Sequence, residues 1–275
     1  MQGLGRMGNA FSVSTNTYHL FSLDEALDGI AAAGFKNVEL TAVKGWTEHV
    51  SAAMSDADVA DVIKKCKARG LVPLALSGHC NLMDEARLVD FLANIELAAR
   101  CGCKYIVTST GEAHFGHNEN SPEDVLIANI KKVLGKCETL GVVMVLETHG
   151  EFGTGESLAK ITREINSPYL GVNYDTANVV FYGKKFPDEE IASCIDQVKY
   201  IHLKDKAGEM GEWNFPAVGK GTLKLDKVLK QLAEAGNTSP ISLEVEFTPA
   251  GPANLTEVNK AVKDSFDYLK RLGVV

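Results

Sequence analysis

Four residues in the second half of the sequence carry side chains that bind divalent metal ions, and each stands at or near the end of a strand-like segment. They are Glu147 in VVMVLETHG, Asp175 in YLGVNYDTAN, His202 in VKYIHLKD and Glu244 in PISLEVEF. Three carboxylates and one imidazole suit a hard or borderline divalent cation. We therefore predict that these four residues hold one divalent metal ion.

Each of these residues taken alone has a purely structural explanation. Glu147 or Asp175 can cap the helix that follows it, and His202 can be a hydrogen-bonded core histidine. Glu244 can pair with a lysine. Four ionisable groups buried at neighbouring strand ends would carry a large desolvation cost unless a cation offset it, so the set favours a metal site. Glu246 is an alternative to Glu244 as the ligand from the eighth strand, because both have the same strand parity. We prefer Glu244, because its depth along the strand better matches the depth of the other three ligands.

Strand-like and helix-like segments alternate along the whole chain, at a spacing of about 25 to 40 residues. The strands are predicted near Phe11–Ser14, Asn37–Thr41, Val72–Ser77, Tyr105–Ser109, Val142–Glu147, Leu170–Asp175, Tyr200–Lys204 and Ile241–Phe247. Eight strand–helix pairs match a (β/α)₈ barrel, which has roughly 250 residues. We predict an α/β protein, a (β/α)₈ TIM barrel whose single domain spans residues 1–275. A doubly wound open sheet is the alternative, but the GxGxxG match at Gly3–Gly8 precedes the first strand instead of following it.

A barrel of this kind brings the predicted ligands together. Side chains of alternate residues point inward, and those nearest the C-terminal end of each strand line the mouth of the barrel. Glu147 shares strand parity with Val143 and Val145, so it continues an inward-facing row. The same parity argument places Asp175 and His202, together with Glu244, on the inner face at one level.

Composition excludes several classes of partner. The chain has 28 basic and 36 acidic residues, a net charge of −8, which disfavours binding to a nucleic-acid backbone. It has no apolar run of about 18 residues and no signal-like segment, so we expect no membrane association and a cytoplasmic enzyme. The six cysteines lack CxxC spacing and are expected to be buried, reduced thiols. A homo-oligomer remains open.

Several motifs resemble one known family. The motifs are E-T-H-G after the fifth strand, Y-D-T-A-N after the sixth, Y-I-H-L-K-D after the seventh, L-E-V-E near the end and V-G-K-G-T-L-K-L-D. Together they resemble the sugar phosphate isomerase/epimerase family of xylose-isomerase-like barrels. The resemblance covers essentially the whole chain. It implies Mn²⁺ or Mg²⁺, or else Co²⁺ or Zn²⁺, as the cofactor. It also implies that Glu147 and Glu244 exchange protons with the substrate, while Asp175 and His202 serve as fixed ligands.

The predicted activity is isomerisation or epimerisation of a small sugar or sugar derivative through a metal-stabilised enediolate. One glutamate removes a proton and the other returns one. Loops after the first four strands are expected to give selectivity, and Trp213 either covers the sugar or packs on a neighbouring helix. The residues expected to contact the substrate are His149, Lys204, His79 and Glu112.

Other activities remain open on this scaffold. Ketose 3-epimerases of the family carry Asp-x-x-His after the sixth strand, whereas this chain has Asp175-Thr176-Ala177-Asn178. A metal-dependent lyase, dehydratase or decarboxylase acting on an oxo-sugar or cyclitol is therefore the main alternative. A metal-dependent endonuclease would need further ligands and a basic surface. A non-catalytic binding barrel or a subunit of a hetero-complex is the remaining class.

Overall fold

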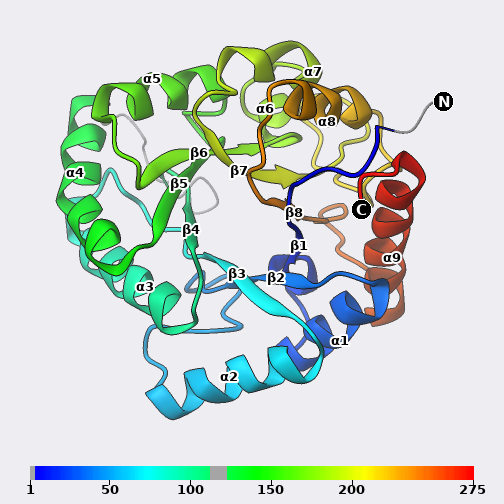
Figure 1. Cartoon of the computed structure of the whole chain (residues 1–275), viewed down its shortest axis with the longest axis horizontal. Coiled ribbons are helices and arrows are strands. Elements are labelled where there is room, and N and C mark those ends of the chain that lie inside the picture. The colour runs from blue at the N-terminus through cyan, green and yellow to red at the C-terminus, as the bar shows by residue number, and fades with distance from the viewer. Residues whose placement is uncertain (1–3, 112–122) are drawn as a thin grey trace.

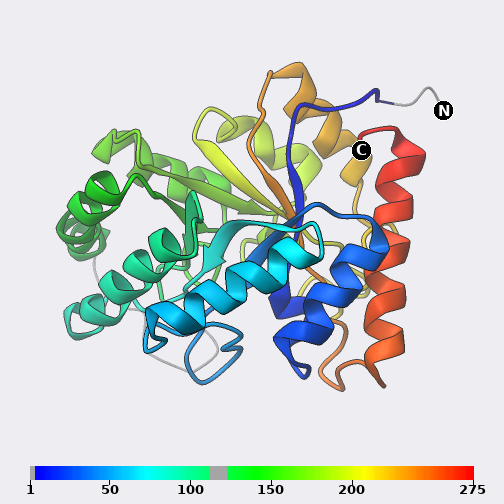
Figure 2. The same ribbon diagram turned by 60° about the horizontal axis from the view of Figure 1, so that its bottom comes forward.

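The computed structural model describes residues 4–111 and 123–275, and its strands form a closed parallel barrel surrounded by helices (Figures 1 and 2). The strands are β1 (Phe11–Ser14), β2 (Asn37–Thr41), β3 (Val72–Ser77), β4 (Tyr105–Thr108), β5 (Val143–Glu147), β6 (Leu170–Asp175), β7 (Val198–Leu203) and β8 (Ile241–Leu243). Each strand pairs with the next, and β1 pairs with β8 to close the cylinder. The predicted (β/α)₈ barrel is confirmed.

The helices follow strands in the sequence, and several of them begin at a side-chain N-cap. They are α1 (Leu23–Ala33), α2 (Asp56–Ala68), α3 (Leu88–Arg100), α4 (Glu123–Leu140), α5 (Gly155–Ile165), α6 (Asn178–Phe181), α7 (Pro187–Glu190), α8 (Leu225–Glu234) and α9 (Leu255–Leu272). At the start of α1, the Ser22 hydroxyl accepts from the Glu25 amide and the Glu25 carboxylate accepts from the Ser22 amide. Gly34 ends that helix with φ of +117°, a conformation that favours glycine. None of the described helices is long and apolar enough to cross a membrane.

Three apolar clusters are present among the described residues, and two of them hold the barrel together. The larger one lies between the strands and the surrounding helices and contains most of the buried side chains, including all six cysteines as free thiols. The smaller one consists of Ala75, Val107, Val145 and Tyr200, whose strand parity places them inside the cylinder. The interior of the barrel is therefore packed with side chains. Towards the C-terminal strand ends it changes from apolar to ionisable residues.

The eighth strand is shorter than predicted, since it ends at Leu243 instead of Phe247. The reason is a change of hydrogen-bonding partner. The amides of Glu246 and Phe247 donate to the carbonyl of Phe215 at 3.3 and 2.9 Å, and the Phe215 amide donates to the Phe247 carbonyl at 2.7 Å. Phe247 has φ of +60°. The chain after β8 thus pairs with the loop that follows β7, and this pairing places Glu244 and Glu246 beside that loop.

Candidate metal centre

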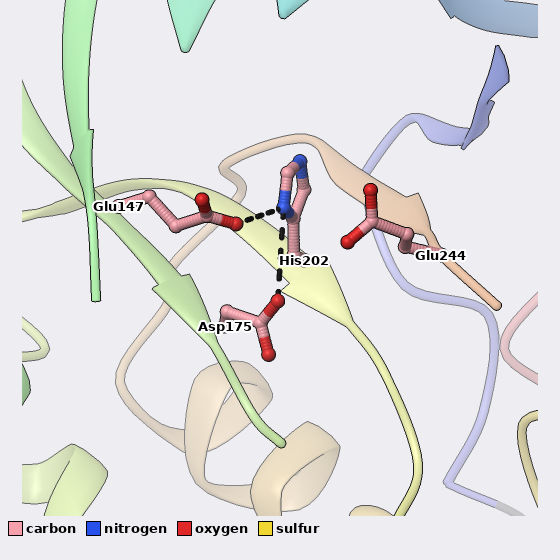
Figure 3. A group of neighbouring side chains, drawn as sticks. All are labelled: Glu147, Asp175, His202 and Glu244. Carbon is pink, nitrogen blue, oxygen red and sulfur yellow. Dashed lines mark hydrogen bonds and ion pairs between the residues drawn. The ribbon is translucent and has the colours of Figure 1, made fainter. Parts of the chain in front are cut away.

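The barrel brings the four predicted ligands together at one end of its interior. Each of Glu147, Asp175, His202 and Glu244 offers one ligand atom, and these atoms all lie within 4.8 Å of one another. Figure 3 shows the four side chains pointing towards one another from β5, β6, β7 and the segment after β8. All four are buried. Ligand atoms about 2.0 to 2.4 Å from a common cation lie at most about 4 to 5 Å apart, so the spacing fits a single metal ion.

The strand register explains why these residues meet. Asp175 on β6 is paired with His202 on β7, and Glu147 on β5 is paired with Asn173, one inward position before Asp175. Nδ1 of His202 lies 2.6 Å from Oε1 of Glu147 and 3.8 Å from Oδ2 of Asp175. The Nδ1 edge of the imidazole therefore faces two of the carboxylates.

Asp175 is held so that one of its oxygens remains available. Its Oδ1 accepts hydrogen bonds from the backbone amides of Ala177 and Asn178 at 2.9 and 2.8 Å. Its Oδ2 is fully buried and receives no hydrogen bond from any part of the chain that the structure describes. Buried carboxylate oxygens in folded proteins nearly always have a partner. A cation held among the four ligands would supply it, so the residues fit a divalent metal.

The balance of charge at this end of the barrel points the same way. When all are ionised, the carboxylates outnumber the basic groups, and this excess of negative charge favours a bound cation. The five carboxylates are those of Glu39, Glu147, Asp175, Glu244 and Glu246, and the three basic groups are those of His79, His202 and Lys204.

The surroundings shift the pKa values of two of the carboxyl groups in opposite directions. Burial alone would raise the pKa of Glu147, but the adjacent imidazoles of His79 and His202 hold that pKa well below its usual range. Burial raises the pKa of Asp175 to about 7, although the nearby Lys204 ammonium opposes the shift. In the metal-free protein Glu147 is therefore ionised at neutral pH, whereas Asp175 binds a proton readily.

Lys204 neutralises the carboxylates on the other side of the site. Its ammonium is buried, lies 3.3 Å from Glu244 Oε2 and 3.8 Å from Asp175 Oδ2, and forms an ion pair with Glu246. The same ammonium lies 4.4 Å from the ring centroid of Phe215. Lys204 thus pairs with both glutamates, but of the two it is Glu244 that belongs to the group of converging ligand atoms. The geometry favours Glu244 over Glu246, and the ligand assignment itself stays a prediction.

A fifth carboxylate at the site, that of Glu39, was missed in the sequence. Glu39 lies on β2 with no exposed surface, and both of its oxygens are 3.0 Å from His202 Nε2. The hydroxyl of Tyr200 also donates to Glu39, at 2.9 Å. A signal was present, because in N-V-E-L-T the apolar Val38 and Leu40 take the outward parity and leave this glutamate at the inward one. Its partner on a distant strand could not be identified without the fold.

Three of the four expected substrate contacts line a cavity over the ligands. His79, His149 and Lys204 surround this cavity, whose volume is about 70 Å³. Nε2 of His79 lies 2.6 Å from Glu147 Oε2, and Nε2 of His149 lies 3.2 Å from the hydroxyl of Tyr182. The fourth expected contact, Glu112, lies outside the described residues. Contact with a substrate remains a prediction for all four.

Trp213 also lines this cavity and packs edge-on against aromatic neighbours. Its ring centroid lies 5.0 Å from that of Phe215 and 5.7 Å from that of Phe181. The two interpretations of Trp213 made from the sequence are therefore compatible, because the indole both packs against neighbouring rings and forms part of the cavity wall.

Comparison with known proteins agrees with this architecture. The family model described as a xylose isomerase-like TIM barrel matches residues 27–272. A search of curated proteins gave no match to the sequence.

Solved structures resemble the chain over nearly its whole length. A xylose isomerase domain protein from Planctomyces limnophilus has 20% identity and a TM-score of 0.74, over 98% of this chain and 97% of that one. A D-psicose 3-epimerase has 14% identity and a TM-score of 0.76, over 96% and 99%. A 3-keto-D-glucoside 4-epimerase from E. coli has 16% identity and a TM-score of 0.73, also over 96% and 99%. At these identities the similarity establishes the fold.

Proposed function

Because the chain belongs to the family of xylose isomerase-like TIM barrels, we propose that it is a divalent-metal-dependent isomerase or epimerase of a sugar or sugar derivative. The observation that carries the proposal is the convergence of Glu147, Asp175, His202 and Glu244 within 4.8 Å of one another. The epimerases among the similar structures support the reaction class. Mn²⁺ and Mg²⁺ are the favoured cofactors, because three of the four ligands are carboxylates.

Glu147 and Glu244 are proposed as the acid/base pair. Glu147 is ionised because His79 and His202 lower its pKa, so it can take a proton from the carbon beside the substrate carbonyl. Glu244 approaches the ligand centre from the other side of His202 (Figure 3) and would return a proton there. A bound divalent cation would polarise the carbonyl and stabilise the negative charge of the enediolate.

Other residues at the cavity are assigned to holding the substrate. The Lys204 ammonium can donate to substrate oxygens, and Asn178, whose Oδ1 lies 3.5 Å from Lys204 Nζ, lines the same cavity. His79 and His149 provide ring nitrogens on the Glu147 side. This arrangement surrounds a polyhydroxylated substrate with donors and acceptors and leaves the two glutamates on either side of the reacting carbons.

Exchange of substrate protons with solvent tests the assignment. The purified protein is analysed for metal, stripped with EDTA, reloaded and incubated in deuterated water with a panel of ketoses, oxo-sugars and cyclitols. We expect deuterium incorporation that EDTA abolishes and that Glu147→Gln and Glu244→Gln each reduce by at least about 100-fold. Glu96→Gln, at an exposed glutamate, is the matched control. Unchanged exchange in both site variants would refute the assigned bases, and metal content measured on the same samples separates loss of metal from loss of a base.

Loss of water or another leaving group is the second candidate reaction. Such a reaction needs an acid near the departing oxygen, and the hydrogen-bonded pair of His149 and Tyr182 lines the cavity beside Glu147. Asn178 also occupies the position at which ketose 3-epimerases carry histidine. Product mass distinguishes the two candidates, since isomerisation conserves mass whereas dehydration or decarboxylation does not.

A further inference from the structure

A second cavity opens directly beside the metal centre. It has a volume of about 520 Å³, compared with about 70 Å³ for the cavity over the ligands. The larger one falls within the range of about 300 to 1,000 Å³ that is usual for small-molecule sites.

The two cavities adjoin and share part of their walls. Asn16, Trp46, Trp213 and Glu246 line both of them. The amide nitrogen of Asn16 donates to Glu244 at 3.0 Å and to Glu246 at 3.3 Å, and its amide oxygen accepts from the Trp46 indole at 3.1 Å. One side chain thus connects a predicted metal ligand to the wall of the second cavity, which we call the side groove.

The walls of the side groove are flat and largely apolar. The rings of His19 and Trp46 are stacked with centroids 4.3 Å apart and planes 17° from parallel. Trp213 and Phe247 add two further aromatic side chains, and Leu20, which is 64% exposed, lies at the edge. Flat aromatic walls favour a planar apolar ligand.

The charges of the side groove disfavour an anionic ligand. Among its described lining residues there is no lysine or arginine, whereas Glu246 contributes a carboxylate. Burial also lowers the pKa of His19, so this imidazole is neutral at physiological pH. A phosphorylated tail would therefore lack a partner in the groove.

We infer that the substrate is an aryl glycoside of an oxo-sugar, with its sugar ring at the metal centre and its aromatic aglycone in the side groove. This inference rests on the proposed function. An enediolate needs a carbonyl next to a hydroxyl-bearing carbon. A ring oxo group supplies the carbonyl and the adjacent ring carbon carries the hydroxyl, while the anomeric oxygen carries the aglycone. The sugar then meets the polar cavity over the ligands and the aglycone meets the aromatic walls of the adjoining side groove.

Equilibrium binding of unreactive probes tests this assignment. Calorimetry with the Mn²⁺-loaded protein measures the dissociation constants of three probes. They are 4-nitrophenyl β-D-glucopyranoside, methyl β-D-glucopyranoside and methyl β-cellobioside. We expect the nitrophenyl glucoside to bind at least about tenfold more tightly than the methyl glucoside. Leu20→Asp should remove most of this preference and leave methyl glucoside binding within about twofold. Val89→Asp, at a residue that is 67% exposed on α3 and does not line the groove, should change neither.

Each contrary outcome has a distinct meaning. Equal affinity for the nitrophenyl and methyl glucosides, no measurable binding of the nitrophenyl glucoside, or an unchanged preference in Leu20→Asp would overturn the inference. Tightest binding of methyl β-cellobioside would assign the groove to a second sugar ring instead. A dimer in size-exclusion chromatography that dissociates in Leu20→Asp would assign it to a second copy of the chain. If Mn²⁺ fails to strengthen methyl glucoside binding while the nitrophenyl preference persists, the proposed function fails and the groove assignment stands.

Discussion

Glu39 on β2 accepts a hydrogen bond from His202 on β7 inside the barrel, with both carboxylate oxygens 3.0 Å from Nε2. The two residues are 163 positions apart in the chain. The contact fixes the ring so that Nδ1 faces Glu147 and Asp175. Carboxylates that hold the second nitrogen of a ligating histidine set its orientation and tautomer in metalloproteins. Glu39 is therefore placed to position His202.

Replacing Glu39 tests this positioning role. Glu39→Gln keeps the size of the side chain but removes its charge, and we expect it to weaken Mn²⁺ binding about 10- to 100-fold. Tyr200→Phe, which removes a donor to Glu39 but keeps the carboxylate, should weaken it less. The dissociation constant measured by calorimetry checks both. Binding within about twofold of the wild type in Glu39→Gln, with the fold retained by circular dichroism, would contradict the assignment.

Metal affinity should rise steeply with pH below neutrality. Burial raises the pKa of Asp175 to about 7, so below that pH a proton competes with the metal for this carboxylate. The pKa of His202 is also raised well above its usual value: burial opposes the shift, but Glu39 and Glu147 outweigh it. Each proton that the metal displaces changes affinity by about tenfold per pH unit. Mn²⁺ titrations between pH 5.5 and 8 should show affinity increasing with pH and protons released on binding. An affinity independent of pH over this range would refute the competition.

Removal of the Lys204 charge should affect metal binding and activity in opposite directions. The ammonium lies near Glu244 and Asp175 and competes with a cation for both carboxylates. Lys204→Met keeps an extended side chain against Phe215. We expect Mn²⁺ affinity to rise several-fold and turnover to fall roughly 100-fold, because a charged donor to the substrate is lost. Assays on whichever substrate the exchange panel identifies, together with calorimetry, check both effects. Unchanged turnover would exclude Lys204 from substrate binding.

The cysteines should be unreactive in the folded protein. All six are buried as free thiols, and burial raises the pKa of Cys66 and of Cys101 to about 11. Only the thiolate reacts, so at pH 8 its population at these sites is very small. DTNB should label almost no thiol in the native protein and all six after denaturation. Substantial labelling of the native protein would contradict the burial of these thiols.

The sequence by itself was sufficient to predict the barrel and the four converging residues. Alternating strand and helix segments with regular caps specify eight local units, and a barrel places every strand end at one mouth. Strand parity then indicates which side chains point inward. Glu147, Asp175, His202 and Glu244 could be selected because each combines inward parity with metal-binding chemistry at the end of a strand.

Only the tertiary structure decided which groups touch. The contact between Glu39 and His202 crosses the barrel, and no local pattern encodes a distance between residues so far apart in the chain. The pairing of Glu246 with Lys204 follows from the early end of β8, which depends on hydrogen bonds to Phe215 from another loop. The side groove likewise forms only where loops after β1, β2, β7 and β8 meet. These features depend on packing between distant segments, whereas the periodicity of each strand and helix is local.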